Sequence, residues 1–360
     1  MKIETYRITR FQFKRDRVIG DSQVSADEVY VAALELTDTN GNTGLGFMQS
    51  LFTPLPDQAE LERIFAQEIW HGLEGRLPVS LVHAVARQRG GNRRMPGIPV
   101  NEALQVALWD LFAKQQDLPL WRVLGAQRQK VRAYASGLDF HLSDSAFTEL
   151  FGKANADGYS AFKIKVGHPD FERDLHRIDL LKKAVRPDPL LMIDANEAWS
   201  AKEAAVKITA IRDAGHRLFW VEDPILRDDH EGLRLLRHAL PFTQINSGEY
   251  LDASGKLDLL RAEGTDILNV HGHISDVMRI GWAAAEFGIP VSLGNTFLEF
   301  GVHMAVALPE VEWLEYSFQN FDHLVEQTMQ IKDGWIHAPD RPGHGLKLSE
   351  NARRSASPKI

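Results

Sequence analysis

The stretch "AFKIKVG", residues 161–167, alternates apolar and basic side chains with the two-residue period of a β-strand. Its apolar side chains, starting at Phe162, belong to one face, and Lys163 and Lys165 belong to the other. A strand that is buried in a sheet cannot hold two ammonium groups unless other charges offset the loss of their hydration. The stretch therefore predicts a buried strand whose lysines lie against acidic side chains from elsewhere in the chain.

The chain on either side of this stretch repeats a pattern of strand, loop and helix from about residue 130 onward. Segments with helical spacing separate eight short apolar runs. These candidate strands are KVRAYASG, AFKIKVG, LLMIDANE, RLFWVEDP, TQINSGE, DILNVHG, IPVSLGN and WLEYSF. Eight strands alternating with helices over roughly 190 residues predict a parallel (β/α)8 barrel of the TIM type. An open doubly wound sheet fits less well, because no glycine-rich phosphate loop follows the first strand.

The first 125 residues have a different pattern and predict an α+β module. Residues 1–11 alternate polar and apolar side chains, and residues 28–48 have the pattern of a hairpin with Asn40-Gly41 in its turn. Helical patterns follow at residues 57–75 and 99–116.

Three of the candidate strands end at acidic residues, Asp194, Glu222 and Glu249, which are spaced by about one βα unit each. The carboxyl ends of adjacent parallel strands lie ~4.8 Å apart on one face of a barrel, so these side chains can converge. Three converging anions repel one another without a cation, and three oxygen ligands without His or Cys suit Mg²⁺. The alternative is that each acid is only a polar residue at the start of a loop. Three acids in phase favour the metal site, whose negative charge would also offset the two lysines.

The composition is that of a globular protein. The 360 residues are 44% hydrophobic and 25% charged, and the net charge of −8 disfavours a general nucleic-acid binder. The absence of cysteine excludes disulfides and thiolate metal sites. No run approaches the ~18 apolar residues of a membrane span, and the N-terminus lacks the apolar region of a signal peptide. We therefore expect a cytoplasmic protein that binds neither a membrane nor nucleic acid.

Four motifs in the order KIK, DAN, VEDP and GE resemble those of the enolase superfamily, in particular relatives of mandelate racemase and muconate-lactonizing enzyme. The resemblance covers nearly the whole chain. It implies an α+β capping domain over residues 1–125 and a modified (β/α)8 barrel over residues 126–320. Residues 321–360 would then form a C-terminal segment that returns to the cap.

The resemblance also implies roles for single residues. The three strand-end acids named above would hold Mg²⁺, and enolase-superfamily sites pair this metal with a lysine or histidine base. Lys165 matches the acid/base that removes a proton α to a carboxylate, and Lys163 matches the lysine that lowers the pKa of this base and touches the substrate. Asn196 matches a residue that lines the site. Glu315 matches an acid on strand eight that can hydrogen-bond the enediolate if protonated.

The seventh and sixth candidate strands depart from the family pattern. Mandelate racemase relatives have a histidine at the end of strand seven and an aspartate at the end of strand six, and muconate-lactonizing relatives have a lysine at the end of strand six. This sequence has Gly294 and Asn295 on strand seven and His271 on strand six. His271 is a candidate acid/base; the alternative is that it only positions another group. Asn295 cannot exchange protons and is a candidate for substrate binding.

The cap loops are expected to set substrate specificity, as they do in the family, and here they correspond to residues 17–28 and 49–58. Four arginines between Arg87 and Arg94 could hold a distal carboxylate or the hydroxyls of an acid sugar. A solvated basic loop is the alternative.

These features predict Mg²⁺-dependent removal of the proton α to a carboxylate through an enediolate, and we expect dehydration of a sugar acid. Lys165 would remove the proton and His271 would assist the departing hydroxyl. A racemase, epimerase or cycloisomerase using the same enediolate is one alternative, and a non-catalytic binding protein is another. The KIK motif and the three acids disfavour the binding protein. We expect a small-molecule carboxylate substrate, and the resemblance suggests a homo-oligomer.

Overall fold

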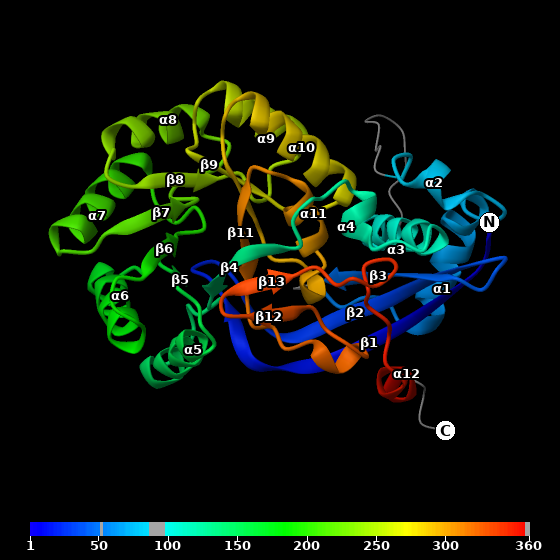
Figure 1. The fold of residues 1–360 in the computed structure, drawn as a ribbon. Helices are drawn as coiled ribbons and strands as arrows, with labels where there is room; N and C mark the ends of the chain where they lie inside the picture. Colours follow the sequence, from blue (N-terminus) through cyan, green and yellow to red (C-terminus); the bar gives the residue numbers. More distant parts are fainter. Residues whose placement is uncertain (51–52, 86–97, 357–360) are drawn as a thin grey trace.

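The computed structural model describes residues 1–50, 53–85 and 98–356, and its central feature is a closed barrel of parallel strands (Figure 1). Neighbouring strands follow the chain order, and β11 pairs with β4 to close the barrel. The barrel strands are β4 (Lys130–Ser136), β5 (Ala161–Lys165), β6 (Leu190–Asp194), β7 (Leu218–Glu222), β8 (Gln244–Ser247), β9 (Ile267–Val270), β10 (Val291–Leu293) and β11 (Val311–Tyr316). The (β/α)8-type barrel is thus confirmed, and each candidate strand forms.

Helices cover the outside of the barrel (Figure 1). They are α5 (Asp144–Ala156), α6 (Phe171–Ala184), α7 (Ala201–Asp213), α8 (His230–Ala239), α9 (Ala253–Arg261), α10 (Ile274–Glu286) and α11 (Val302–Ala307), with the short η2 (Phe297–Glu299) before α11. Seven helices therefore join the eight strands between Lys130 and Tyr316, all of which the structure describes. After β11 the chain enters the short helix η3 (Asp322–Leu324) in place of an eighth helix.

Local sequence explains how a βα unit begins its helix and buries its strand. At the start of α7, the Ser200 side chain accepts a hydrogen bond from the Glu203 backbone N–H, and the Glu203 side chain accepts one from the Ser200 backbone N–H. All five residues of β5 are buried, as expected for a strand that has helices on one side and the barrel interior on the other. The two lysines of β5 are therefore largely shielded from bulk water.

The N-terminal part contains a three-stranded antiparallel sheet in the order β1–β2–β3. Its strands are β1 (Ile3–Gly20), β2 (Ser25–Asp38) and β3 (Thr43–Ser50), and the helices of this part are α1 (Gln58–Glu68), η1 (Trp70–Gly72), α2 (Pro78–Leu81), α3 (Val100–Gln115) and α4 (Leu120–Val123). The predicted hairpin with Asn40-Gly41 in its turn forms between β2 and β3. The expected cap loop at residues 17–28 is wrong for most of its length, because only residues 21–24 lie outside β1 and β2. Alternate side chains of β1 from Phe13 to Ile19 are partly or fully buried, which a free loop would not require.

Two glycines allow β3 to pack closely on α3. A Cβ atom added to Gly46 would lie 2.0 Å from the carbonyl oxygen of Ala103, and one added to Gly44 would lie 2.1 Å from that of Ala107. Both distances are far below van der Waals contact. Close packing of this strand on this helix thus requires glycine at both positions.

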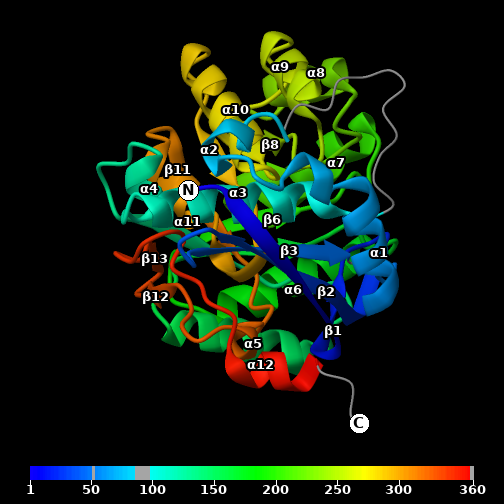
Figure 2. The ribbon, with the colours of Figure 1, turned by 90° about the vertical axis from the view of Figure 1, so that its right-hand side faces the viewer.

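The C-terminal segment contacts both the barrel and the N-terminal sheet. Its strands β12 (Gln330–Lys332) and β13 (Trp335–His337) form a hairpin, and β13 pairs antiparallel with β4 of the barrel. Its helix α12 (Glu350–Ala356) lies next to β1 (Figure 2). Arg353 of this helix forms an ion pair with Glu35 of β2 at 2.5 Å.

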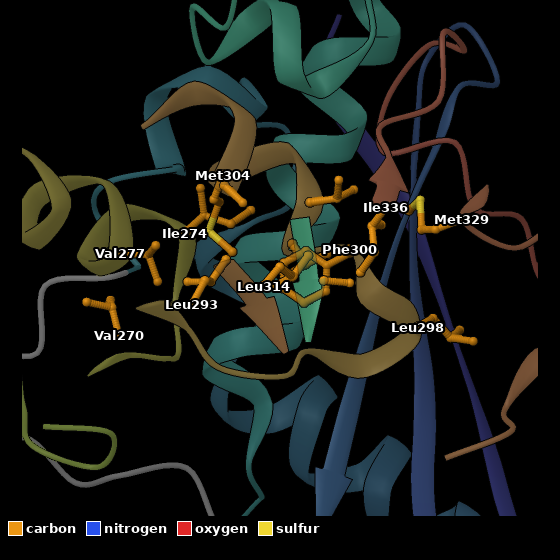
Figure 3. Close-up of a cluster of buried hydrophobic side chains, with 14 of the residues drawn as sticks. Val270, Ile274, Val277, Leu293, Leu298, Phe300, Met304, Leu314, Met329 and Ile336 are labelled. Atoms are coloured by element: carbon orange, nitrogen blue, oxygen red, sulfur yellow. The ribbon is translucent and has the colours of Figure 1, made fainter. Parts of the chain in front are cut away.

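One apolar cluster continues from the barrel wall into the N-terminal part. In the region drawn in Figure 3, the cluster contains Val270, Leu293 and Leu314 from β9, β10 and β11 together with Met304 of α11. Ile336 of β13 belongs to the same cluster, so the C-terminal hairpin shares the core. Among the described residues, every helix is too short or too polar to cross a membrane.

Candidate active site

The two lysines of β5 contact acidic side chains that come from three other strands. Lys165 Nζ lies 2.6 Å from Asp194 Oδ2 at the end of β6, and Lys163 Nζ lies 2.6 Å from Glu222 Oε1 at the end of β7. Lys163 Nζ also lies 3.3 Å from Glu315 Oε1 on β11. The lysines are only 2% and 7% exposed. The alternation in AFKIKVG therefore correctly predicted a buried strand with acidic partners.

The ion pairs determine the charge of both lysines. Burial opposes the charge of Lys163, but Glu222 and Glu315 outweigh it and raise its pKa well above the ordinary value. Burial also opposes the charge of Lys165, but Asp194 outweighs it and raises its pKa. The charge of Lys163 acts to lower the pKa of Lys165, in the direction that the resemblance implies, but the carboxylates outweigh this effect. Both lysines are thus ammonium groups in this arrangement.

The three predicted metal ligands lie in the same buried region, next to the two lysines. Burial raises the pKa of Glu222 and of Glu249, and neighbouring carboxylates act in the same direction. Burial also opposes the charge of Asp194, but Lys165 and Lys163 outweigh it and lower its pKa. Glu249 is only 8% exposed, and its carboxylate has no hydrogen bond or ion pair within the part of the chain that the structure describes.

The donor set fits Mg²⁺, although the lysines stand between its members. Within residues 1–50, 53–85 and 98–356, no three acidic or histidine side chains are already grouped so as to hold a metal ion. Lys163 Nζ lies 3.3 Å from Asp194 and 2.6 Å from Glu222, so its ammonium occupies space between these two ligands. Three buried carboxylates on adjacent strands supply the hard oxygen ligands and the charge that this cation requires. Their role as ligands stays a prediction.

Asn196 connects Lys165 to the turn of the β1–β2 hairpin. Its Oδ1 atom accepts a hydrogen bond from Lys165 Nζ at 2.7 Å. Its backbone carbonyl accepts a hydrogen bond from Gln23 Nε2, and Gln23 lies in the hairpin turn. The tip of the N-terminal hairpin thus lies over the rim of the barrel at Asn196, next to Lys165.

Asn295 and Glu315 lie next to each other at the ends of β10 and β11. The backbone N–H of Asn295 donates to Glu315 Oε2 at 3.0 Å, and its side-chain oxygen lies 3.5 Å from Gln319 Nε2. Burial opposes the charge of Glu315, but Lys163 and Lys165 outweigh it and lower its pKa. Glu315 is therefore a carboxylate in this arrangement, whereas the role implied for it by the resemblance requires the protonated form.

His271 follows β9 and borders two cavities. A cavity of about 60 Å³ is also lined by Asn295 and by Phe47 and Gln49 of β3. A second cavity of about 240 Å³ is also lined by Lys256 of α9, by residues of the loops after β8 and β9, and by residues of α10. His271 and Asn295 thus share the smaller cavity, between the barrel rim and the N-terminal sheet. Whether His271 reaches the substrate stays a prediction.

Sequence reasoning missed a buried ion pair that contacts the end of β5 at Lys165. Asp139 Oδ1 accepts a hydrogen bond from the Lys165 backbone N–H at 3.2 Å, and Asp139 Oδ2 lies 2.7 Å from Arg177 of α6. Burial raises the pKa of Asp139 against the effect of Arg177. No motif includes either residue, so only the fold identifies the pair. The predicted arginine cluster, Arg87 to Arg94, lies outside the described residues.

Comparison with known protein families and curated proteins places these features in context. The profile of the family described as "Enolase C-terminal domain-like" matches residues 147–352. L-talarate/galactarate dehydratase of Salmonella typhimurium is 29% identical over 350 residues, which cover 94% of this chain and 85% of the relative. The 3,6-anhydro-alpha-L-galactonate cycloisomerase of Streptomyces coelicolor is 27% identical, with coverage of 88% of both chains.

Solved structures agree with these matches. A candidate mandelate racemase from Mesorhizobium loti is 64% identical, has a TM-score of 0.93, and covers 98% of this chain and 94% of its own. The L-talarate dehydratase of a Polaromonas species, solved with Mg and L-glucarate, is 29% identical with a TM-score of 0.81. That comparison covers 98% of this chain and 96% of the dehydratase.

Proposed function

We propose that this chain, which belongs to the enolase C-terminal domain-like family, is a lyase that removes water from a hydroxylated carboxylic acid of the sugar-acid class. Membership of the enolase superfamily makes it an enzyme of the lyase or isomerase type. The names of the two dehydratase relatives support a sugar-acid substrate.

One observation carries the proposal: a pair of buried lysines at the end of β5 lies inside a set of carboxylates at the C-terminal rim of a parallel barrel. Active sites of such barrels lie at this rim. The arrangement supplies a proton acceptor, a second cation and a set of oxygen ligands in one place.

Lys165 is proposed as the base that removes the α-proton. Its ammonium is paired with Asp194 at 2.6 Å, so this ion pair must open and the group must lose its proton before it can accept another. Asn196 Oδ1 lies 2.7 Å from the same nitrogen and can then hold the amine in place. Lys163 keeps its positive charge beside Glu222 and is proposed to bind the substrate carboxylate.

Asp194, Glu222 and Glu249 are the proposed ligands of Mg²⁺, which when bound would stabilise negative charge as it develops on the substrate carboxylate. His271 is proposed to give a proton to the departing β-hydroxyl. The C–O bond then breaks, the hydroxyl leaves as water, and the enol that remains becomes a 2-keto-3-deoxy acid. We also propose that the enzyme is cytoplasmic and forms a homo-oligomer.

The test is a screen of acid sugars with Mg²⁺ present, followed by analysis of the active substrate in D₂O. Wild-type enzyme should release a 2-keto acid, and NMR should show loss or exchange of the α-hydrogen. Lys165→Ala should lose both signals by about 10²-fold or more, because a methyl group cannot accept a proton. Lys153→Ala, which changes an exposed lysine of α5, serves as the control.

A Lys165→Ala enzyme with most of the wild-type rate would show that another group is the base. Exchange or inversion of the α-hydrogen without loss of water would favour the racemase or epimerase alternative. A lactone rearrangement would favour a cycloisomerase, in agreement with the relative from Streptomyces coelicolor.

A further inference from the structure

Asp223 contacts all three turns that follow the strands of the predicted metal ligands. It comes directly after Glu222 and is completely buried. Its backbone has φ of +36°, in the left-handed region that residues other than glycine seldom adopt. A buried acid in a strained conformation beside a functional carboxylate calls for a physical explanation, which its hydrogen bonds supply.

The side chain of Asp223 holds the turn after β8. Asp223 Oδ1 accepts hydrogen bonds from Ser247 Oγ at 2.6 Å and from the Gly248 backbone N–H at 3.3 Å. Glu249 is the next residue along the chain. The position of the Glu249 backbone relative to Glu222 therefore depends on this side chain.

The backbone and the second oxygen of Asp223 hold the turn after β6. The Asp223 carbonyl accepts a hydrogen bond from the Glu197 backbone N–H at 2.7 Å. Arg227 lies 3.0 Å from Asp223 Oδ2 and 3.1 Å from Glu197 Oε1, so it links the two acids. Asp194 is the last residue of β6, and Asn196 and Glu197 are the second and third residues after it.

Each of these turns has a left-handed residue where it leaves its strand. The φ angles are +44° at Asn196, +64° at Glu197 and +112° at Gly248, in addition to +36° at Asp223. Such conformations cost roughly 1–2 kcal/mol for a residue with a side chain. They persist only where surrounding contacts over-determine them. The hydrogen bonds and the ion pair of Asp223 are contacts of this kind.

We propose that Asp223 is a positioning residue that fixes the spacing of Asp194, Glu222 and Glu249 and so sets the affinity of the site for a divalent cation. The inference rests on the proposed function for the identity of these ligands. Asp223 acts through the turns and is not itself a ligand. Outer-shell partners of metal ligands commonly change metal affinity by 10–100-fold when they are replaced.

The test measures the Kd of Mg²⁺ by isothermal titration calorimetry on the full chain, together with Tm. Asp223→Gly keeps a backbone that tolerates the left-handed φ but removes every side-chain contact, so Mg²⁺ affinity should fall by about tenfold or more. Asp223→Asn keeps an acceptor for Ser247 and loses the charge that faces Arg227, so its loss should be smaller. Raising Mg²⁺ should restore part of the kcat of both variants.

Two further variants calibrate the measurement. Asp213→Asn changes an aspartate at the end of α7 whose side chain is 62% exposed, and it should match the wild type. Glu222→Gln removes a proposed ligand and should abolish measurable binding. A merely structural role of Asp223 would lower Tm and leave the Mg²⁺ affinity of the folded protein unchanged.

The outcomes separate this inference from the proposed function. Suppose that Asp223→Gly folds and keeps the wild-type Mg²⁺ affinity, whereas Glu222→Gln loses binding. This result would overturn the positioning role of Asp223 and would still support the proposed metal site. Wild-type protein that binds no Mg²⁺ would overturn the ligand set and the positioning role together.

Discussion

His271 is the proposed proton donor to the departing hydroxyl. It borders the small cavity under the N-terminal sheet and the larger cavity beside α9, whereas His273 borders only the larger one. If His271 protonates the leaving hydroxyl, His271→Asn should slow dehydration by about 10²-fold or more and leave α-hydrogen exchange by Lys165 measurable. NMR in D₂O would follow exchange while an assay for keto acids follows loss of water. His273→Asn is the matched control.

Normal turnover of the His271→Asn enzyme would contradict the assignment. Equal loss of exchange and of dehydration would also contradict it, because a group that acts only on the leaving hydroxyl does not take part in removal of the α-proton. In either case the second catalytic group would have to be sought elsewhere in the site.

Single residues differ in how far sequence alone could place them. Lys163 and Lys165 were predictable, because two charges in an apolar strand require buried partners, and the acids that end the next strands supply them. Asp223 was visible inside the VEDP motif, but its contacts with Ser247 and Arg227 depend on how three turns meet in space. The Asp139–Arg177 pair had no signal, because it joins a strand end to a helix without any fixed spacing.

At the scale of elements, the contact of β3 with α3 holds the N-terminal part together. We expect Gly46→Ala to lower the free energy of unfolding by about 2 kcal/mol or more, because its Cβ would meet the Ala103 carbonyl at 2.0 Å and backbone atoms cannot move aside easily. Gly72→Ala is the control, since a Cβ there has no atom within 4 Å and should change stability by no more than about 0.5 kcal/mol. Urea unfolding followed by circular dichroism measures both. Equal midpoints for the two variants would show that β3 can move away from α3 at little cost.

Strands and helices were predicted correctly where the apolar residues followed one clear period. They were predicted wrongly where contacts with distant parts of the chain determine the local structure. The barrel strands are short, apolar and separated by amphipathic helices, so each was found. Residues 17–20 were assigned to a cap loop, yet they belong to β1. Arg17 donates to the backbone carbonyls of Ser317 and Phe318, and these contacts come from the far end of the chain. A local pattern cannot anticipate such partners.

At the scale of the whole molecule, buried histidines make stability depend on pH. Burial lowers the pKa of His303 on α11 to about 3, and the charges of His344 and Arg341 act in the same direction. Its ordinary value is 6.5, so the unfolded chain takes up a proton below pH 6.5 that the folded chain refuses. Stability should therefore fall as pH falls from 6.5 toward 3, by about 2 kcal/mol between pH 7 and pH 5 for this one group.

His303→Asn removes this titration, so the urea midpoint of the variant should change less between pH 7 and pH 5 than that of the wild type. This holds even if the variant is less stable than the wild type at both pH values. His71→Asn, which changes an exposed histidine, should keep the wild-type pH dependence. A His303→Asn slope equal to that of the wild type would place the acid sensitivity elsewhere, for example at His344, whose pKa burial also lowers.

The return of the C-terminal segment to the N-terminal sheet affects the order in which contacts can form during synthesis and folding. The ion pair between Glu35 and Arg353 joins residues 318 positions apart, and the contact of Arg17 with Phe318 spans 301 positions. During synthesis β2 is therefore made some 318 residues before Arg353 of α12, its partner in this ion pair. Contacts of such long sequence separation form late and slow folding. Until these contacts form, apolar side chains of the sheet are exposed, and such exposure favours aggregation of folding intermediates.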